Sequence, residues 1–93
     1  MNRSSPRIAL GPGVLSRELD GEAVLLSLEA GQYFGLDEIG TRVWVLLLEH
    51  GELEPVVQAV VGEYDVTEAQ FRADLDRFVD QMIANGLLRW ETP

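Results

Sequence analysis

Few residues of this chain have types and spacing that suggest chemistry. His50 is the single histidine and cysteine is absent, which leaves no Cys–His pair, no thiolate nucleophile and no cysteine-bound metal. His50 falls at an expected helix end, where a basic group interacts favourably with the helix dipole, and we prefer this interpretation to general-base chemistry. No serine lies in a nucleophile-elbow context. The sequence therefore predicts a protein that is not an enzyme and holds no cofactor.

Three acidic residues, Asp74, Asp76 and Asp80, raise the question of a metal site. On a helix Asp76 and Asp80 lie one turn apart, but Asp74 is rotated from Asp76 by about 200°. We therefore interpret them as part of a solvated helix face and expect no bound metal. The "GPG" at residues 11–13 lacks the strand, helix and further glycine of a nucleotide-binding loop, so we expect a turn there.

The overall charge argues against some partners. The 93 residues include 16 acidic residues against 7 arginines and no lysine, and the formal net charge is −9. Such a field repels nucleic acid and attracts a basic partner. The longest apolar run, "VWVLLL", is far shorter than a membrane span, and "IALGPGVL" is too broken for a signal peptide. We therefore expect one cytoplasmic domain that binds neither nucleic acid nor membrane.

The elements that must position any site begin with strands. Asp20-Gly21 lies between the apolar runs 14–19 and 23–28, and this is a strong hairpin signal because both central residues of a type I′ turn need positive φ. A second turn leads to "QYFGL" at 32–36, which is rich in aromatic residues. The pattern predicts a three-stranded antiparallel meander.

The hydrophobic period then changes from two residues to 3.6, which predicts three helices. Each helix has start and stop signals: an N-cap at Asp37 and an end at His50-Gly51 for the first, Pro55 in the first turn of the second, and a capping box of Thr67 and Gln70 with an end at Asn85-Gly86 for the third. Residues 87–90 are expected to add a short final strand.

The predicted class is α+β, a winged-helix-like domain with a three-stranded antiparallel sheet followed by three helices. Residues 14–90 form this single domain in the prediction, and residues 1–13 form a flexible N-terminal arm. On the third helix we expect Phe71 and Val79 in the core and Met82 to be partly open, since a thioether adapts to a ligand. The alternative, that Met82 only fills the core, stays open.

A winged helix raises the question of DNA, and the third helix argues against it. Its charged residues are four acids and two bases: Glu68, Asp74, Asp76 and Asp80 against Arg72 and Arg77. A helix that enters the major groove is expected to be basic. A winged-helix regulator of transcription, or another protein-interaction module, therefore remains only as the competing hypothesis.

The strand at 32–36 is the remaining candidate site. Alternation places Phe34 and Leu36 on one face, which we expect to point at the core, and Tyr33 and Gly35 on the other. In one interpretation Tyr33 merely closes the rim of the sheet. In the other, the strand is an open edge that accepts a strand from another chain, because "QYFGL" has neither lysine nor proline to blunt it.

Residues 15–88 resemble the PqqD-like family, the RiPP recognition elements. The most specific parts are "YFGLDEIGTRVW", the "EYDV" before the third helix and the closing "GLL". The "YFGL" form is more similar to the discrete leader-binding proteins of lasso-peptide pathways than to the member from the pyrroloquinoline-quinone pathway. Asp37 stands where many relatives carry asparagine, and both residues can cap a helix.

The resemblance implies a monomeric adaptor without catalytic activity. Such proteins bind the leader of a ribosomally made precursor peptide between the third strand and the third helix. They then present the peptide to a separate, transglutaminase-like leader peptidase and to an ATP-dependent cyclase. Carried over to this sequence, the peptide-binding residues form three groups. The pairing strand is Gln32, Tyr33, Phe34, Gly35 and Leu36, and Tyr33 also forms one wall of the pocket. The apolar wall is Leu75, Phe78 and Met82, and the charged rim is Arg72 and Asp74.

Overall fold

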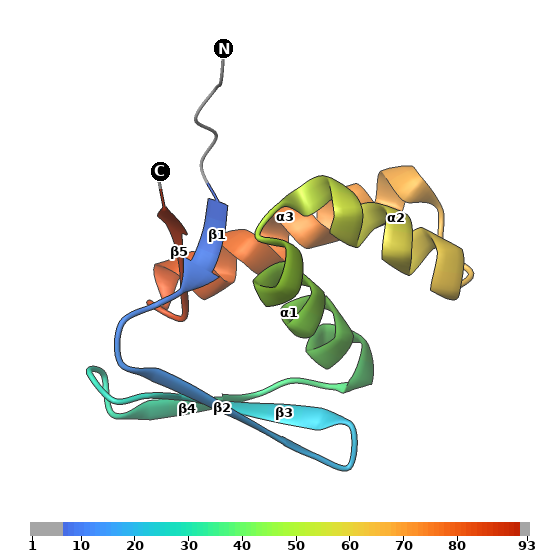
Figure 1. Cartoon of the computed structure of the whole chain (residues 1–93). Coiled ribbons are helices and arrows are strands. Elements are labelled where there is room, and N and C mark those ends of the chain that lie inside the picture. The colour runs from blue at the N-terminus through green and yellow to red at the C-terminus, as the bar shows by residue number, and fades with distance from the viewer. Residues whose placement is uncertain (1–6, 92–93) are drawn as a thin grey trace.

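Five strands and three helices form the described part of the chain, residues 7–91 of the computed structural model (Figure 1). Their order is β1 (Arg7–Leu10), β2 (Val14–Leu19), β3 (Glu22–Ser27), β4 (Gln32–Gly35), α1 (Glu38–His50), α2 (Leu53–Glu63), α3 (Glu68–Ala84) and β5 (Leu88–Glu91). The helices lie on one side of an antiparallel sheet of β2, β3 and β4, which confirms the predicted α+β class. Within residues 7–91, no helix is long and apolar enough to cross a membrane.

The β2–β3 hairpin and the edge position of β4 confirm the predicted meander. Asp20 and Gly21 have φ angles of 54° and 81°, the left-handed conformation that a type I′ turn requires. β2 pairs with one side of β3 and β4 with the other, so the order in the sheet is β2-β3-β4. β4 is therefore an edge strand.

The predicted ends of α1 are also confirmed. The Asp37 carboxylate accepts a hydrogen bond from the Gly40 N–H over 2.7 Å, which caps the first turn. At the other end Gly51 adopts a φ of 73°, and its N–H donates to the Leu47 C=O over 2.8 Å. The Asp37 cap fixes the point at which the chain leaves β4 and enters α1.

α3 begins and ends as predicted, with one difference in its cap. Thr67 Oγ1 accepts a hydrogen bond from the Gln70 N–H over 3.2 Å. The Gln70 side chain does not complete the capping box, because its amide donates instead to Asp74 Oδ1 over 3.0 Å. Residues four apart are neighbours on a helix surface, so the Asp74 side chain is within reach of Gln70, as the N-cap residue is. Gly86 ends the helix with a φ of 74°.

The N-terminal segment differs from the flexible arm expected over residues 1–13. β1 pairs with β5 in a separate two-stranded antiparallel sheet, and this partner corresponds to the short final strand expected at 87–90. Ile8 is buried, and its N–H donates to the Gly51 C=O over 2.8 Å. A four-residue strand gives too little local pattern to reveal a partner at the far end of the chain. Residues 1–6 lie outside the described part.

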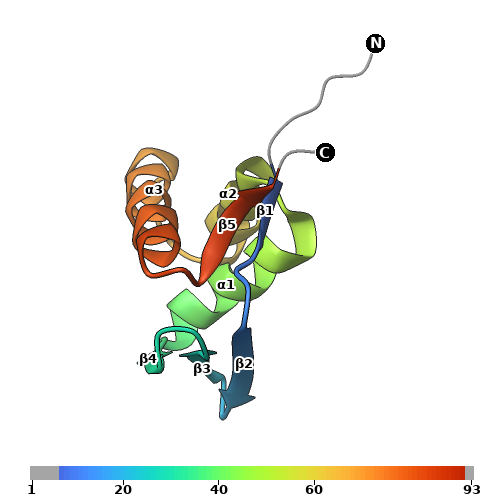
Figure 2. The same ribbon diagram turned by 90° about the vertical axis from the view of Figure 1, so that its left-hand side faces the viewer.

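The core lies between the three-stranded sheet and the helices, with α1 at its centre (Figures 1 and 2). The largest fully buried side chains come from β3, from all three helices and from the segment that leads into and begins β5: Leu25, Trp44, Leu47, Val56, Val57, Val60, Leu75, Leu87 and Leu88. One small domain thus buries a single continuous apolar cluster, in which distant parts of the chain meet.

Phe71 and Val79 are buried as expected, but the expectation that Met82 is partly open is wrong. The Met82 residue is only 7% exposed. Its C=O accepts a hydrogen bond from the Leu87 N–H over 2.8 Å, so the chain turns back at the end of α3 and Leu87 joins the same buried cluster. The returning chain and β5 therefore cover the end of α3.

A buried hydroxyl joins β3, the end of β4 and α1. Thr41 Oγ1 accepts a hydrogen bond from the Ala23 N–H over 2.7 Å and donates to the Leu36 C=O over 3.4 Å. The Leu36 N–H in turn donates to the Ala23 C=O over 2.8 Å. In an ordinary antiparallel pair the Ala23 N–H would bind the Leu36 C=O directly, and here the Thr41 hydroxyl takes that place.

Thr41→Val should destabilise the fold, because it leaves the buried Ala23 N–H without an acceptor while keeping the shape of the side chain. We expect a loss of about 1–3 kcal/mol in the free energy of unfolding, measured by urea denaturation followed by circular dichroism. Thr41→Ser is the control, since it keeps the hydroxyl and should lose less. A valine variant as stable as the wild type would contradict this role.

Candidate functional site

Two residues of β4 direct their backbone groups to the open edge of the sheet. The hydrogen bond from the Leu36 N–H to the Ala23 C=O fixes which positions of β4 bond to β3. Bonded and non-bonded pairs alternate along an antiparallel ladder, so the bonded positions are Leu36, Phe34 and Gln32. The N–H and C=O groups of Tyr33 and Gly35 therefore point away from β3, towards the open side. An incoming strand would find two donors and two acceptors there.

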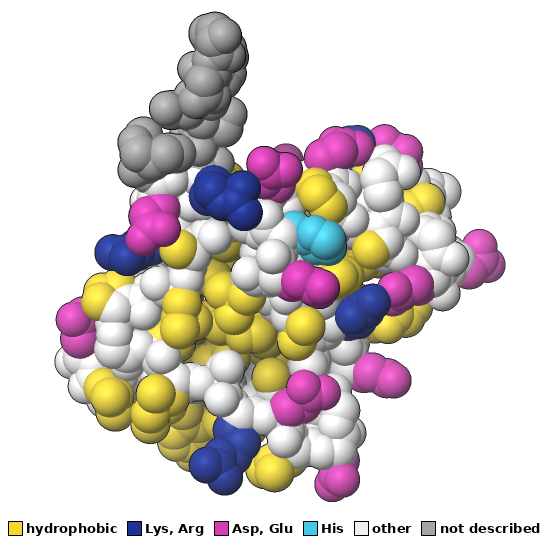
Figure 3. Space-filling view, viewed as in Figure 1, with side chains coloured by type: hydrophobic (Ala, Val, Ile, Leu, Met, Phe, Trp, Pro, Cys, Tyr) yellow, Lys and Arg dark blue, Asp and Glu magenta, His cyan; other side chains and the backbone are white. Residues whose placement is uncertain are grey.

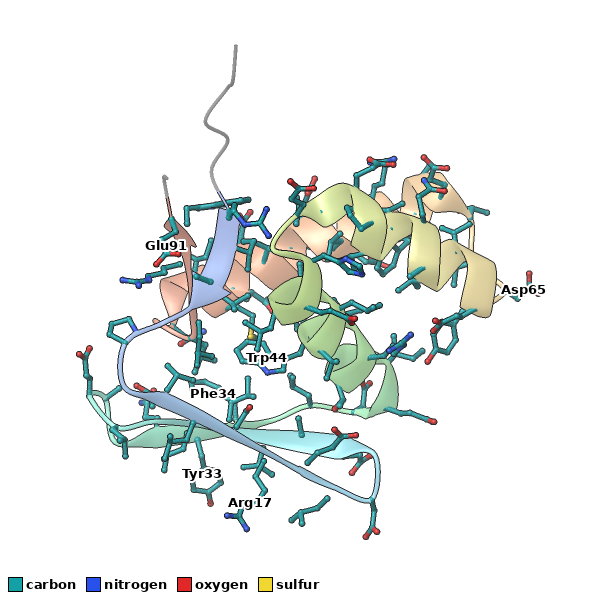
Figure 4. The ribbon with its side chains drawn as sticks, viewed as in Figure 1. Arg17, Tyr33, Phe34, Trp44, Asp65 and Glu91 are labelled. Atoms are coloured by element: carbon teal, nitrogen blue, oxygen red, sulfur yellow. The ribbon has the colours of Figure 1, made fainter. Side chains whose placement is uncertain are left out.

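The side chains of β4 divide between the two faces of the sheet, as predicted. Phe34 points towards the helices and Trp44, whereas Tyr33 points away from them (Figure 4). Phe34 and Leu36 are half-buried against the core, and Tyr33 is 76% exposed. A Cβ added at Gly35 would have no atom within 4 Å, so the face of the sheet turned away from the helices is unobstructed at this position.

An apolar pocket of about 220 Å³ opens where β4 runs into α1. Its walls come from the start of α1, the end of α2, the α2–α3 connection and α3: Ile39, Gly40, Val43, Val60, Tyr64, Val66, Phe71, Asp74, Leu75 and Phe78. Ile39 and Gly40 follow β4 almost directly in the chain, so continuity alone places the pocket beside the end of that strand. Figure 2 shows β4 and α3 on the same side of the molecule.

The pocket gathers three of the five predicted α3 residues: Asp74, Leu75 and Phe78. Met82 is buried at the far end of the helix and does not line it. Tyr33 is also absent from the lining, because its ring lies on the opposite face of the sheet. Of the predicted site residues on β4, the backbone of Tyr33 and Gly35 forms the edge, while Phe34 packs beneath it.

Arg72 lies away from the pocket, in contact with α2. Its guanidinium donates to the carboxylate of Glu54 over 2.8 Å and to that of Glu68 over 2.9 Å. The hydrogen bond from Arg72 holds the pKa of the Glu54 carboxyl below its usual range, and the bond to Glu54 raises the pKa of Arg72 in return. Arg72 is thus paired with two acidic residues, on a side of α3 that does not line the pocket.

Asp74 is the one charged residue of the pocket lining. Its Oδ1 accepts hydrogen bonds from the Gln70 amide and from the Arg77 guanidinium, both on α3 itself. The carboxylate stays about half exposed, so a basic group on a ligand can reach it and share it with Arg77. Within residues 7–91, no three histidine or acidic side chains are grouped closely enough to hold a metal ion.

Sequence patterns missed seven residues that line the pocket, among them Ile39, Tyr64 and Val66. Ile39 falls on the apolar face of α1, which periodicity assigns to the core, yet it is 48% exposed. Tyr64 and Val66 come from the α2–α3 connection. The "EYDV" segment is the one signal that pointed to them, since it belongs to the motif shared with relatives.

Two solved structures share this fold. One, described as "TbiB1 in Complex with the TbiA(beta) Leader Peptide", has a TM-score of 0.83 and 38% sequence identity, and the match covers 87% of this chain and 94% of that chain. The other, "Lasso peptide synthetase B1 complexed with the leader peptide", has a TM-score of 0.83 and 24% identity, with 89% and 98% covered. A search of curated proteins found no match.

Residues 22–88 match the family described as "Coenzyme PQQ synthesis protein D (PqqD)". This stretch runs from β3 to the start of β5, so it includes both the open edge of β4 and the whole pocket. The family match covers most of the chain, and the first of the two solved structures is similar to this chain in sequence as well as in fold. The chain therefore belongs to the PqqD family and is a PqqD-like RiPP recognition element.

Proposed function

We propose that this protein is a non-catalytic adaptor in lasso-peptide biosynthesis. It binds the leader segment of a ribosomal precursor peptide as an added strand on β4, and delivers it to a separate leader peptidase and cyclase. The observation that carries the proposal is the unpaired backbone of Tyr33 and Gly35 beside an apolar pocket. The likeness to two proteins solved with leader peptides supports it.

Backbone and pocket have different tasks in this mechanism. The N–H and C=O groups of Tyr33 and Gly35 pair with any extended peptide, so they supply affinity that does not depend on sequence. Alternate side chains of the added strand point to the helix side, where one of them reaches the apolar pocket. The pocket then selects the sequence, and Asp74 at its rim favours a nearby basic residue in the leader.

An adaptor of this kind works by raising the local concentration of its cargo. Once the leader is held on β4, the core of the precursor is tethered close to any enzyme that also binds the adaptor. The adaptor needs no catalytic group of its own, since the peptidase and the cyclase supply the chemistry. A separate adaptor also lets one leader serve two enzymes in succession.

The alternative of a DNA-binding regulator is not favoured. Both arginines of α3 are engaged by acids: Arg72 by Glu54 and Glu68, and Arg77 by Asp74. The remaining charges on the helix, Asp76 and Asp80, repel phosphate. A recognition helix in the major groove requires the opposite balance.

Leader binding should be saturable and of moderate strength. We expect a dissociation constant in the micromolar to sub-micromolar range, about −8 to −10 kcal/mol, because a short added strand and one apolar anchor bury a modest surface. The measurement is fluorescence anisotropy of a labelled leader peptide from the cognate precursor. A scrambled leader is the control, and the absence of saturation at high micromolar protein would rule out the adaptor.

Gly35→Pro should weaken leader binding while leaving the fold intact. Proline removes the outward N–H, and an edge strand tolerates it because that N–H bonds to nothing within the sheet. We expect an affinity about three- to tenfold lower, the equivalent of one backbone hydrogen bond. Gly35→Ala is the matched control, since its Cβ meets no atom within 4 Å and its N–H remains. Equal affinities for the two variants would place the leader elsewhere.

Ile39→Ala should also weaken leader binding, because the side chain lines the pocket. Loss of its outer carbons removes apolar contact with the leader, and about a five- to thirtyfold lower affinity follows if they are buried in the complex. Val45→Ala is the control on the same helix, since Val45 is also exposed but lies outside this pocket. Equal effects of the two changes on leader affinity would show that the pocket does not hold the leader.

A further inference from the structure

The face of the three-stranded sheet that turns away from the helices is apolar. We call it the outer sheet face and define it by Leu15, Arg17, Leu19, Val24, Leu26 and Tyr33. The pairing of the strands aligns Leu15, Leu26 and Tyr33 in one row across all three strands. Leu15 is 57% exposed and Leu19 59%. Figure 3 shows hydrophobic side chains gathered along the lower left of the molecule, over this sheet.

Such a face is unusual for an antiparallel sheet with one covered side. The exposed side of such a sheet ordinarily carries polar residues, in alternation with the core-facing ones. Here the outward positions carry leucine, valine and tyrosine, with Arg17 and Glu22 as the charged exceptions, and most of those on β2 and β3 line a single shallow hollow. A contiguous apolar patch of this kind marks a site of interaction with another macromolecule.

Arg17 gives this face a distinctive charge. Five other arginines in residues 7–91 each form an ion pair with an acid: Arg7, Arg42, Arg72, Arg77 and Arg89. Arg17 forms no ion pair with any described residue, and it points away from the helices among the apolar side chains (Figure 4). In a chain of net charge −9, a cation on the edge strand β2 that pairs with no described acid fits a partner that offers a carboxylate.

A second copy of this chain does not fit these features. Each copy carries a net charge of −9, so two copies packed face to face would repel each other. The occupant is therefore a different protein.

The outer sheet face is continuous with the edge of β4. Tyr33 belongs to both, since its backbone points to the open edge and its ring lies on the outer face. A leader strand added to β4 widens the sheet, and every second leader side chain then lies on the outer face beside Tyr33. The complex thus presents a composite surface made partly of protein and partly of leader.

We propose that this composite surface docks the leader peptidase, through an apolar patch that carries a carboxylate opposite Arg17. The inference rests on the proposed function. The peptidase is the partner that must act while the leader is bound, because the bond it cleaves joins the leader to the core. A surface that is complete only with the leader in place recruits the enzyme to loaded adaptor in preference to empty adaptor.

Charge reversal at Arg17 tests the proposal with the whole chain. The cleavage rate of the full-length precursor by the purified peptidase is measured below saturation of the enzyme, with leader affinity measured separately by anisotropy. Arg17→Glu should lower the rate about tenfold, as for an arginine that is buried in an interface, and leave leader affinity within about twofold. Arg89→Glu makes the same charge change at an exposed arginine of β5, outside the outer sheet face, and should leave both unchanged.

Leu19→Ser is a second variant on the same face, and its exposed position makes it harmless to the fold. It should also lower cleavage with leader affinity retained. The docking proposal is wrong if both variants bind leader and support cleavage at the wild-type rate. It is equally wrong if sedimentation shows a wild-type dimer that Arg17→Glu dissociates, since the face then binds a second copy. Failure of the wild type to bind leader would instead remove the adaptor function itself.

Discussion

The Thr41 hydroxyl is the contact on which the candidate site depends. It binds both the Ala23 N–H and the Leu36 C=O, and so ties the central strand, the end of the edge strand and the first helix at one point. Asp37 caps the same helix one turn earlier. Together they fix the angle between β4 and α1, and hence the position of the pocket relative to the open edge. An edge strand without such a tie would fray, because it is bonded on one side only.

This arrangement lets one short strand present groups in three directions. The alternation of an antiparallel ladder turns the backbone of Tyr33 and Gly35 to the open side, while the pleat sends Phe34 to the core and Tyr33 to the outer face. In the proposed function, peptide pairing uses the edge, selection by the pocket uses the helix side, and the outer face is left for a protein partner. The three surfaces are separate because backbone hydrogen bonds, inward side chains and outward side chains point along different axes.

Most local elements could be predicted from residues that are close in the sequence. Asp20-Gly21 demands positive φ at two positions, Asp37 and Thr67 cap helices, and Gly86 ends one, and each effect acts within a few residues. The edge position of the third strand followed in the same way, because a meander joined by short turns leaves its last strand unpaired on one side. The motif shared with relatives then identified the family.

The tertiary structure decided which of the candidate residues share a site. Periodicity shows that Arg72, Leu75 and Met82 belong to α3, but the side that each one faces depends on what packs against the helix. α2 engages Arg72 and the chain returning towards β5 buries Met82, whereas the start of α1 forms a pocket with Leu75. The pairing of β1 with β5 joins the two ends of the described part of the chain, and short strands carry no local signal for so distant a partner. Local chemistry thus determines each element, while contacts between distant segments determine which faces remain open.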